Sequence, residues 1–130
     1  MNSQFKGVLV TLGFTAAIIT LVIVFAGGDD NGYTDTPSKY DEFAQCLADK
    51  GAIMYGADWC SWCKQEKEAF GNSFRFINYV ECPDDPQRCL AVGIENYPTW
   101  TFPDRQLPAG AQGLEKLSEE SGCSLPTETE

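Results

Sequence analysis

Two cysteines separated by two residues, Cys60 and Cys63, follow a short apolar run and open a stretch with the composition of a helix. At this spacing the two thiols lie about one helical turn apart, close enough to join as a disulfide. The first thiol would stand at the N-terminus of the helix, where unpaired backbone N–H groups and the positive end of the helix dipole favour a thiolate. The thiolate is the form that attacks disulfides. The pair therefore predicts a redox-active dithiol, with Cys60 as the nucleophile and Cys63 as the resolving thiol.

An inert structural disulfide and a zinc site would fit the same spacing. Small secreted domains contain CxxC pairs without redox activity, and structural zinc sites combine two close-spaced ligand pairs. The four candidate zinc ligands are Cys60, Cys63, Cys82 and Cys89. A position at the start of a helix behind a strand argues against an inert disulfide, as does the later Pro98, and the seven-residue step from Cys82 to Cys89 fits a zinc ligand pair poorly. We therefore favour redox chemistry, and we expect no metal and no cofactor other than the Cys60–Cys63 disulfide itself.

The chain has 130 residues, six cysteines and no histidine. This length allows one domain of modest size. An even number of cysteines in a small domain behind an apolar N-terminal segment indicates disulfides and an oxidising compartment. The net charge of −10 argues against nucleic acid or anionic lipid as a partner, because binding to phosphates needs clustered Lys and Arg. We interpret the acidity as a source of solubility.

Residues 8–26 carry no charge over nineteen positions and are rich in Val, Leu, Ile and Phe. This is about the length needed to cross the hydrocarbon core of a membrane as a helix. Lys6 before the segment and the acidic pair after it place the N-terminus in the cytoplasm and the rest outside. A cleaved signal peptide is the alternative, but its apolar core would exceed the usual length of roughly 7–15 residues. We expect residues 1–28 to be a single-pass anchor in the cell membrane, residues 29–36 to be a flexible tether, and the domain to lie on the periplasmic side.

The rest of the chain alternates between helix and strand patterns, which predicts an α/β domain over residues 37–125 with a central sheet of about four strands flanked by helices. Pro37 would open the first helix and Gly51 would end it. Residues 52–80 read as strand, helix and strand, which brings the two cysteines to the carboxyl edge of the sheet. The other expected helices cover residues 60–70, 86–92 and 114–121, and the expected strands cover residues 52–55, 76–80, 99–102 and 105–107. Residues 126–130 would form a disordered tail.

Several short motifs carry a resemblance to known families. The order of the elements, residues 59–63 (WCSWC) and residues 97–100 (YPTW) resemble the thioredoxin fold. Residues 50–57 (KGAIMYGA), 65–68 (QEKE) and 79–82 (YVEC) more closely resemble the thioredoxin-like domains that are fused to, or paired with, vitamin K epoxide reductase homologues in bacteria and plastids. The resemblance covers nearly the whole of the predicted domain.

This resemblance implies a membrane-tethered thiol–disulfide oxidoreductase that oxidises the thiols of exported proteins. A predicted membrane segment stands here in place of a four-helix reductase domain, so the quinone-linked, vitamin K epoxide reductase-like partner would be a separate membrane protein. The dipeptide Ser61-Trp62 lacks the histidine of many oxidising relatives, so we expect a redox potential between the reducing and the strongly oxidising extremes. The alternatives are a reductant or isomerase on the same fold, and a non-catalytic module that binds a metal or a peptide.

The resemblance also implies roles for residues near the cysteines. Pro98 matches a proline with a cis peptide bond that lies against the CxxC motif, which would turn the Tyr97 backbone toward an extended substrate. The alternative is an ordinary trans proline at the start of an edge strand. Trp59, Trp62 and Trp100 are candidates for an apolar, substrate-binding rim around the sulfurs, although Trp100 suits the core at least as well.

One position departs from the thioredoxin pattern. Many thioredoxins carry a buried acid six residues before the nucleophile, which moves protons to and from the resolving thiol. Met54 takes that position in this chain. Glu66 and Glu81 are candidate substitutes, and the sequence does not choose between them.

The other four cysteines are candidates for structural disulfides. Cys82 and Cys89 match a second pair in the same relatives, which either locks the turn between a strand and a short helix or relays electrons from the first pair. We favour the lock, because short closed loops are common. Cys46 and Cys123 would pair by elimination as a second structural disulfide, but six cysteines permit fifteen pairings. Two buried free thiols remain an alternative for them.

Overall fold

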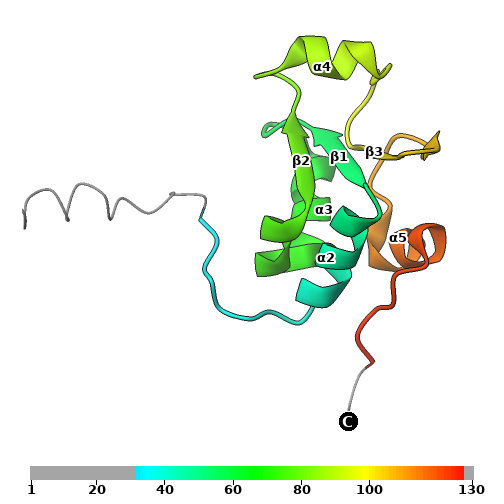
Figure 1. Ribbon diagram of the computed structural model, residues 1–130. Helices are drawn as coiled ribbons and strands as arrows, with labels where there is room; N and C mark the ends of the chain where they lie inside the picture. The colour runs from blue at the N-terminus through cyan, green and yellow to red at the C-terminus, as the bar shows by residue number, and fades with distance from the viewer. Residues whose placement is uncertain (1–31, 128–130) are drawn as a thin grey trace, which may run out of the picture. The chain divides into compact units, whose positions relative to one another are not determined.

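The computed structural model describes residues 32–127, and Figure 1 shows their arrangement. In chain order the elements are α2 (Asp41–Asp49), β1 (Ile53–Gly56), α3 (Ser61–Phe70), the 3-10 helix η1 (Gly71–Phe76), β2 (Asn78–Glu81), α4 (Pro86–Ala91), β3 (Thr99–Phe102), β4 (Arg105–Gln106) and α5 (Gly113–Ser121). The predicted anchor over residues 1–28 lies outside the described residues. Within residues 32–127, no helix is both long enough and apolar enough to cross a membrane.

The four strands form one mixed sheet in the order β2-β1-β3-β4. β1 and β2 run parallel, with Gly56 opposite Glu81 at their ends. β3 pairs antiparallel with β1, and β4 pairs antiparallel with β3. A βαβ unit followed by an antiparallel hairpin and a final helix is the thioredoxin-like α/β arrangement, so the predicted fold class is confirmed for this part of the chain.

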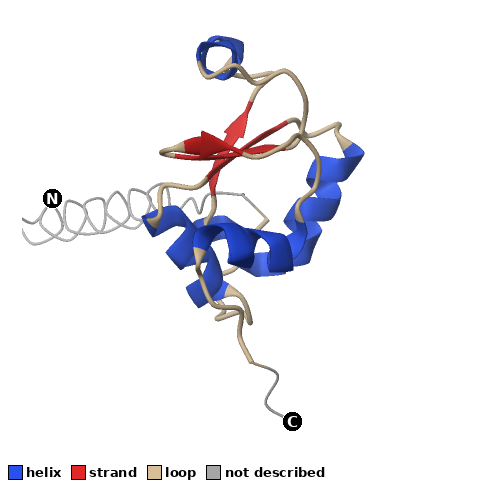
Figure 2. Ribbon diagram, turned by 90° about the vertical axis from the view of Figure 1, so that its right-hand side faces the viewer, coloured by secondary structure: helices blue, strands red, loops and turns tan. Residues whose placement is uncertain are grey.

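The sheet buries different residues on its two faces. Successive side chains of a strand point to opposite faces, so in β1 Met54 joins one buried cluster and Tyr55 joins the other. The larger cluster lies under α2, α3 and α5. The smaller cluster lies under α4 and consists of Tyr55, Val80, Cys82, Cys89 and Ile94. Figure 2 shows the short helix α4 at the top, across the sheet from the other helices.

The first helix begins later than the sequence predicts. α2 starts at Asp41, whereas Pro37 was expected to open it. The reason is a tight turn, in which the N–H of Asp41 donates to the carbonyl oxygen of Ser38 and the N–H of Ser38 donates to the Asp41 carboxylate. The predicted end is confirmed, because Gly51 follows the helix with a φ of 75°, a conformation that glycine adopts without strain.

The second strand is also shorter than predicted. Residues 76–80 were expected to be a strand, but Phe76 ends the 3-10 helix η1 and β2 begins at Asn78. η1 is held by a long-range contact that no local sequence pattern predicts. The Arg75 guanidinium binds both carboxylate oxygens of Asp41, at 3.0 and 2.7 Å. Long-range pairing has therefore overridden the local strand propensity of this stretch.

Two disulfides join separate parts of the domain. Cys46 of α2 is bonded to Cys123, which follows α5, over a sequence separation of 77. Cys82, directly after β2, is bonded to Cys89 of α4. Cys82 and Cys89 therefore supply no thiolate ligands to a zinc site with the first pair.

Candidate active site

Cys60 stands at the junction between β1 and α3. β1 ends at Gly56, and the turn that follows is closed by a hydrogen bond from the N–H of Cys60 to the carbonyl oxygen of Ala57, at 3.0 Å. Cys60 is the N-cap of α3, and its sulfur accepts the N–H of Cys63 at 3.2 Å. A backbone N–H and the positive end of a helix dipole both stabilise negative charge at this position. The sequence thus folds locally so that one thiol of the motif caps the helix.

The two thiols of the motif differ in their access to solvent. Both are free, but Cys63 has an exposed fraction of 0%, whereas Cys60 keeps 7% and lines a groove. Burial is the main cause that raises the pKa of Cys63 to about 12, and the neighbouring Cys60 sulfur adds to it. Cys60 is therefore the sulfur that an incoming thiolate reaches, and Cys63 lies behind it.

The groove in front of Cys60 has a volume of about 420 Å³. Its lining residues are Trp59, Cys60, Ser61, Trp62, Glu95, Asn96 and Tyr97. Trp59 and Trp62 are 71% and 59% exposed, which is unusual for the largest apolar side chain and leaves both indoles free to contact another molecule. Trp100, by contrast, is completely buried and belongs to the core. The rim consists of two tryptophans, not three.

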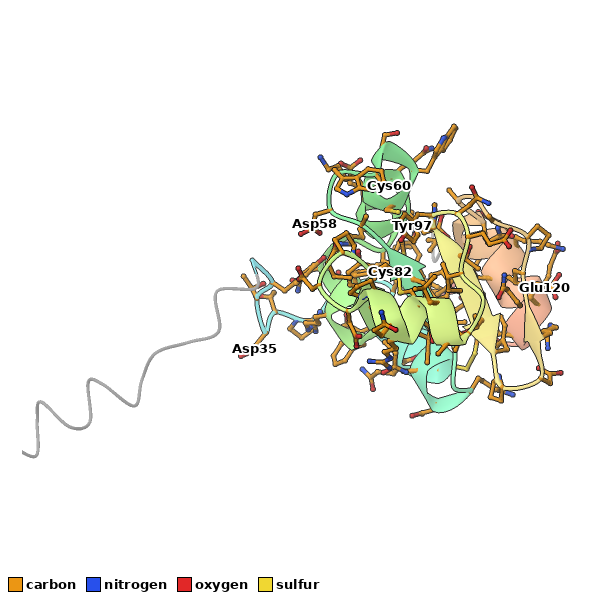
Figure 3. The ribbon with its side chains drawn as sticks, turned by 90° about the horizontal axis from the view of Figure 1, so that it is seen from above. Asp35, Asp58, Cys60, Cys82, Tyr97 and Glu120 are labelled. Carbon is orange, nitrogen blue, oxygen red and sulfur yellow. A yellow bond between two sulfur atoms is a disulfide. The ribbon has the colours of Figure 1, made fainter. Side chains whose placement is uncertain are left out.

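Tyr97 and Pro98 come from the loop before β3. Tyr97 lines the same groove, whereas Pro98 is buried behind it and is not a lining residue. The Tyr97–Pro98 peptide bond is cis, and Tyr97 lies close to Cys60 in Figure 3. The Tyr97 ring meets the Trp59 ring edge to face, with the ring centroids 6.0 Å apart. The structure thus brings the first cysteine, its neighbouring indole and the residue before the proline to one place, from segments far apart in the sequence.

The Glu66 side chain lies in the core, where its carboxylate binds groups of β3 and α5. It is buried, and its carboxylate accepts the indole N–H of Trp100 at 3.0 Å. The same carboxylate accepts the backbone N–H groups of Gln112 and Gly113 at the start of α5. A carboxylate at a helix N-terminus is stabilised by the unpaired N–H groups there. Glu66 therefore ties α3 to β3 and α5.

Glu81 has a different position, at the end of β2. One carboxylate oxygen accepts the backbone N–H of Asp58 at 2.9 Å, and the other accepts the hydroxyl of Tyr79 at 2.5 Å. Tyr79 in turn borders the same space as Cys63, because both side chains lie against the backbone of Gly56. Of the two candidate acids, Glu81 is thus the one near the resolving thiol.

Sequence analysis did not single out several of these residues. Glu95 and Asn96 line the groove, and Gly56 and Tyr79 flank the resolving thiol. Tyr79 belongs to the YVEC motif, and alternation along a strand places it on the same face as Glu81. What the sequence lacks is the register of β2 against β1, which decides that this face meets Cys63.

Comparison with known proteins finds sequence relatives, one of which is a thiol-disulfide oxidoreductase. No family model matches the sequence. The thiol-disulfide oxidoreductase LTO1 of Arabidopsis thaliana is 39% identical over 105 residues, which take in 71% of this chain and 28% of that protein. The similarity shows homology to a thiol-disulfide oxidoreductase. The chain spans little more than a quarter of that relative's length.

Two thioredoxins are among the similar solved structures. The germline-specific thioredoxin Deadhead of Drosophila melanogaster is 17% identical with a TM-score of 0.42, over 55% of this chain and 76% of that one. The thioredoxin of Fasciola hepatica is 16% identical with a TM-score of 0.40, over the same shares of the two chains.

Proposed function

We propose that this protein is a membrane-tethered thiol–disulfide oxidoreductase that exchanges its Cys60–Cys63 pair with the thiols of exported proteins. The observation that carries the proposal is the asymmetry of the pair: Cys60 caps α3 and opens onto a groove, while Cys63 is buried behind it. Homology to a thiol-disulfide oxidoreductase supports the same chemistry.

The exchange begins with the pair as a disulfide. A substrate thiolate attacks the Cys60 sulfur, the Cys60–Cys63 bond breaks, and Cys63 leaves as a thiolate that takes up a proton. The second substrate thiolate then attacks the substrate sulfur of the mixed disulfide and releases Cys60. Two substrate thiols have become one disulfide, and the Cys60–Cys63 disulfide has become two thiols.

The groove would hold the substrate during these steps. An extended segment would lie along the Tyr97 backbone, and apolar side chains next to the reacting cysteine would contact Trp59 and Trp62. Indole rings bury large apolar areas at little cost in conformational entropy, which suits the binding of varied unfolded chains.

Reoxidation would come from a separate quinone-linked membrane protein that resembles vitamin K epoxide reductase. The support for this partner is the resemblance of the KGAIMYGA, QEKE and YVEC motifs. The tether would be the apolar residues 8–26, with the domain outside the cytoplasm. The two disulfides of the domain fit an oxidising compartment.

The test uses the purified full-length protein in detergent. After oxidation, it should introduce a disulfide into a reduced dithiol peptide, and the Cys60→Ala variant should not. Cys63→Ala should accumulate a mixed disulfide through Cys60 that is stable enough for mass spectrometry. Equal oxidation by the wild type and Cys60→Ala would exclude catalysis by this pair and leave a binding module.

The direction of transfer is tested separately. The redox potential of the pair and its state in intact cells distinguish an oxidase, which is held oxidised, from a reductant or isomerase, which is held reduced. Loss of the oxidised form on deleting the vitamin K epoxide reductase-like protein would support the proposed partner, and an unchanged redox state would exclude it.

A further inference from the structure

Each catalytic cycle moves one proton onto and off Cys63. When the Cys60–Cys63 disulfide opens, Cys63 takes up a proton, and when the disulfide closes again, Cys63 must lose it before it can attack. Cys63 is completely buried, and its thiol has a pKa of about 12, chiefly because of that burial. Closure at neutral pH therefore needs a group that accepts the proton close to the sulfur.

Met54 cannot accept a proton, although it occupies the position where many thioredoxins have an acid. The neighbouring backbone offers an opening instead, two residues further along β1. A Cβ atom built on Gly56 would lie 3.0 Å from the Cys63 sulfur and 3.2 Å from the Tyr79 hydroxyl oxygen. Because glycine has no such atom, the sulfur and the hydroxyl both border the same empty position, with no side chain of β1 between them.

The Tyr79 hydroxyl is already oriented to pass a proton on. It donates to a carboxylate oxygen of Glu81 at 2.5 Å, and the other oxygen of Glu81 accepts the N–H of Asp58 at 2.9 Å. The parallel register places Glu81 opposite Gly56 at the ends of the two strands. Glu81 is half-buried, so its side chain keeps contact with water, whereas Cys63 is completely buried.

Two charged side chains complete the surroundings. From α3, Lys67 places its ammonium 3.9 Å from the centre of the Tyr79 ring and 3.2 Å from a carboxylate oxygen of Asp58. Its positive charge favours the Cys63 thiolate, against the larger effect of burial. Asp58 faces the cluster from the turn before Cys60, and Glu81 faces it from β2. Phe74 of η1 packs on Tyr79 and carries no charge.

We propose that Tyr79 and Glu81 form the proton path of Cys63, an inference that rests on the proposed exchange function. In closure, the Cys63 sulfur attacks the Cys60 sulfur while its proton passes to the Tyr79 oxygen and the Tyr79 proton passes to Glu81. The bond between Cys60 and the partner sulfur breaks, and that sulfur leaves as a thiolate. Opening of the disulfide runs the same path in reverse. Tyr79 is unchanged overall, and Glu81 holds the proton until water removes it.

The test separates the attack by Cys60 from the closure by Cys63. Reduced full-length protein is mixed with excess dithionitrobenzoate, which releases one thionitrobenzoate when Cys60 attacks it and a second when Cys63 displaces the adduct from Cys60. The first phase depends on the reagent concentration, and the second phase does not. Tyr79→Phe and Glu81→Gln preserve the shape of each side chain and remove the transferable proton or its acceptor.

Both variants should leave the first phase unchanged and slow the second by about 10- to 100-fold at about pH 7, within the range of general-base contributions. The wild-type second phase should vary little with pH around neutrality. In the variants it should rise by about tenfold per pH unit, because closure then depends on the small thiolate fraction, and the deficit should shrink in alkali. A purely structural role of Tyr79 and Glu81 would not change how steeply the second-phase rate depends on pH.

Matched controls come from the same elements. Tyr55→Phe changes a buried tyrosine on the opposite face of β1, and Glu68→Gln changes an exposed glutamate of α3. Both variants should keep the wild-type second-phase rate and its dependence on pH. Identical second-phase rates and pH profiles for Tyr79→Phe, Glu81→Gln and the wild type would overturn the proton path and leave the exchange function intact. A wild type that releases only one thionitrobenzoate would overturn both.

Discussion

Two neighbouring strand–helix units of this domain have the same arrangement, but their cysteines are in different states. β1 runs into α3 and β2 runs into α4, and each junction carries a cysteine. The strand ends adjoin, since the N–H of Cys82 donates to the carbonyl oxygen of Gly56 at 2.9 Å. The ten-residue α3 buries three of its side chains, whereas the six-residue α4 buries only Cys89. In the first unit both cysteines are free, and in the second they are joined.

The difference shows what each helix needs in order to stay in place. α3 is held by Phe70 in the core and by the bonds of Glu66 to β3 and α5, so its position does not depend on a covalent link. α4 has little apolar surface to bury, and the Cys82–Cys89 disulfide attaches it to the end of β2. Cysteines become available for exchange where packing alone positions the helix.

The largest expected effect is on turnover. Cys60→Ser should reduce thiol oxidation by about 1000-fold or more, because the hydroxyl cannot form the mixed disulfide. The double variant Cys82→Ala/Cys89→Ala should keep at least about half of the wild-type turnover, since that pair holds α4 and does not exchange. Turnover of a reduced dithiol peptide measures both. If the double variant were as inactive as Cys60→Ser, the second pair would be part of the electron path.

The next effect is on stability. Removing the Cys82–Cys89 disulfide should lower the free energy of unfolding by about 2–3 kcal/mol, because the unfolded chain regains the entropy that the short closed loop removes. Urea unfolding measures the loss, and amide hydrogen exchange should show faster exchange over residues 83–94 than over α3. Equal exchange in both units would contradict the view that α4 depends on its covalent link.

The two thiols of α3 should also react differently with alkylating agents. Since burial raises the pKa of Cys63 to about 12, its thiolate is scarce at neutral pH and its alkylation rate should rise by about tenfold per pH unit up to that value. Cys60 should react at least about tenfold faster at neutral pH, because it lines the groove. Peptide mapping of iodoacetamide adducts at several pH values gives both rates. Faster modification of Cys63 would reverse the assigned roles.

The smallest effect concerns substrate binding. Trp62→Ala should raise the KM for a peptide substrate by about two- to tenfold, because an aromatic contact is worth about 0.5–1.5 kcal/mol. Leu90→Ala is the matched control, since Leu90 is an exposed apolar residue of α4, outside the groove-lining set. Equal KM values for the two variants would mean that the exposed indole does not contact the substrate.

The sequence predicted those parts of the molecule that local patterns determine. The strand over residues 99–102 and the helix after Cys60 lie where the pattern put them, because alternation, helix caps and glycine stops act over a few residues. η1 was missed, because Arg75 and Asp41, whose ion pair holds it, are far apart in the sequence. The late start of α2 was missed because Ser38 and Asp41 form a local turn where Pro37 was expected to open the helix. The neighbourhood of Cys63 was missed for a related reason, since it depends on strand register.

The bond between Cys46 and Cys123 ties the first helix to the segment that follows the last one. Every surface loop between those positions is therefore enclosed in a covalent ring. A single proteolytic cut in such a loop adds one water and would leave the two pieces covalently attached until a reductant was added. In a compartment rich in proteases, the ring would let the domain survive a first cleavage with its parts still assembled.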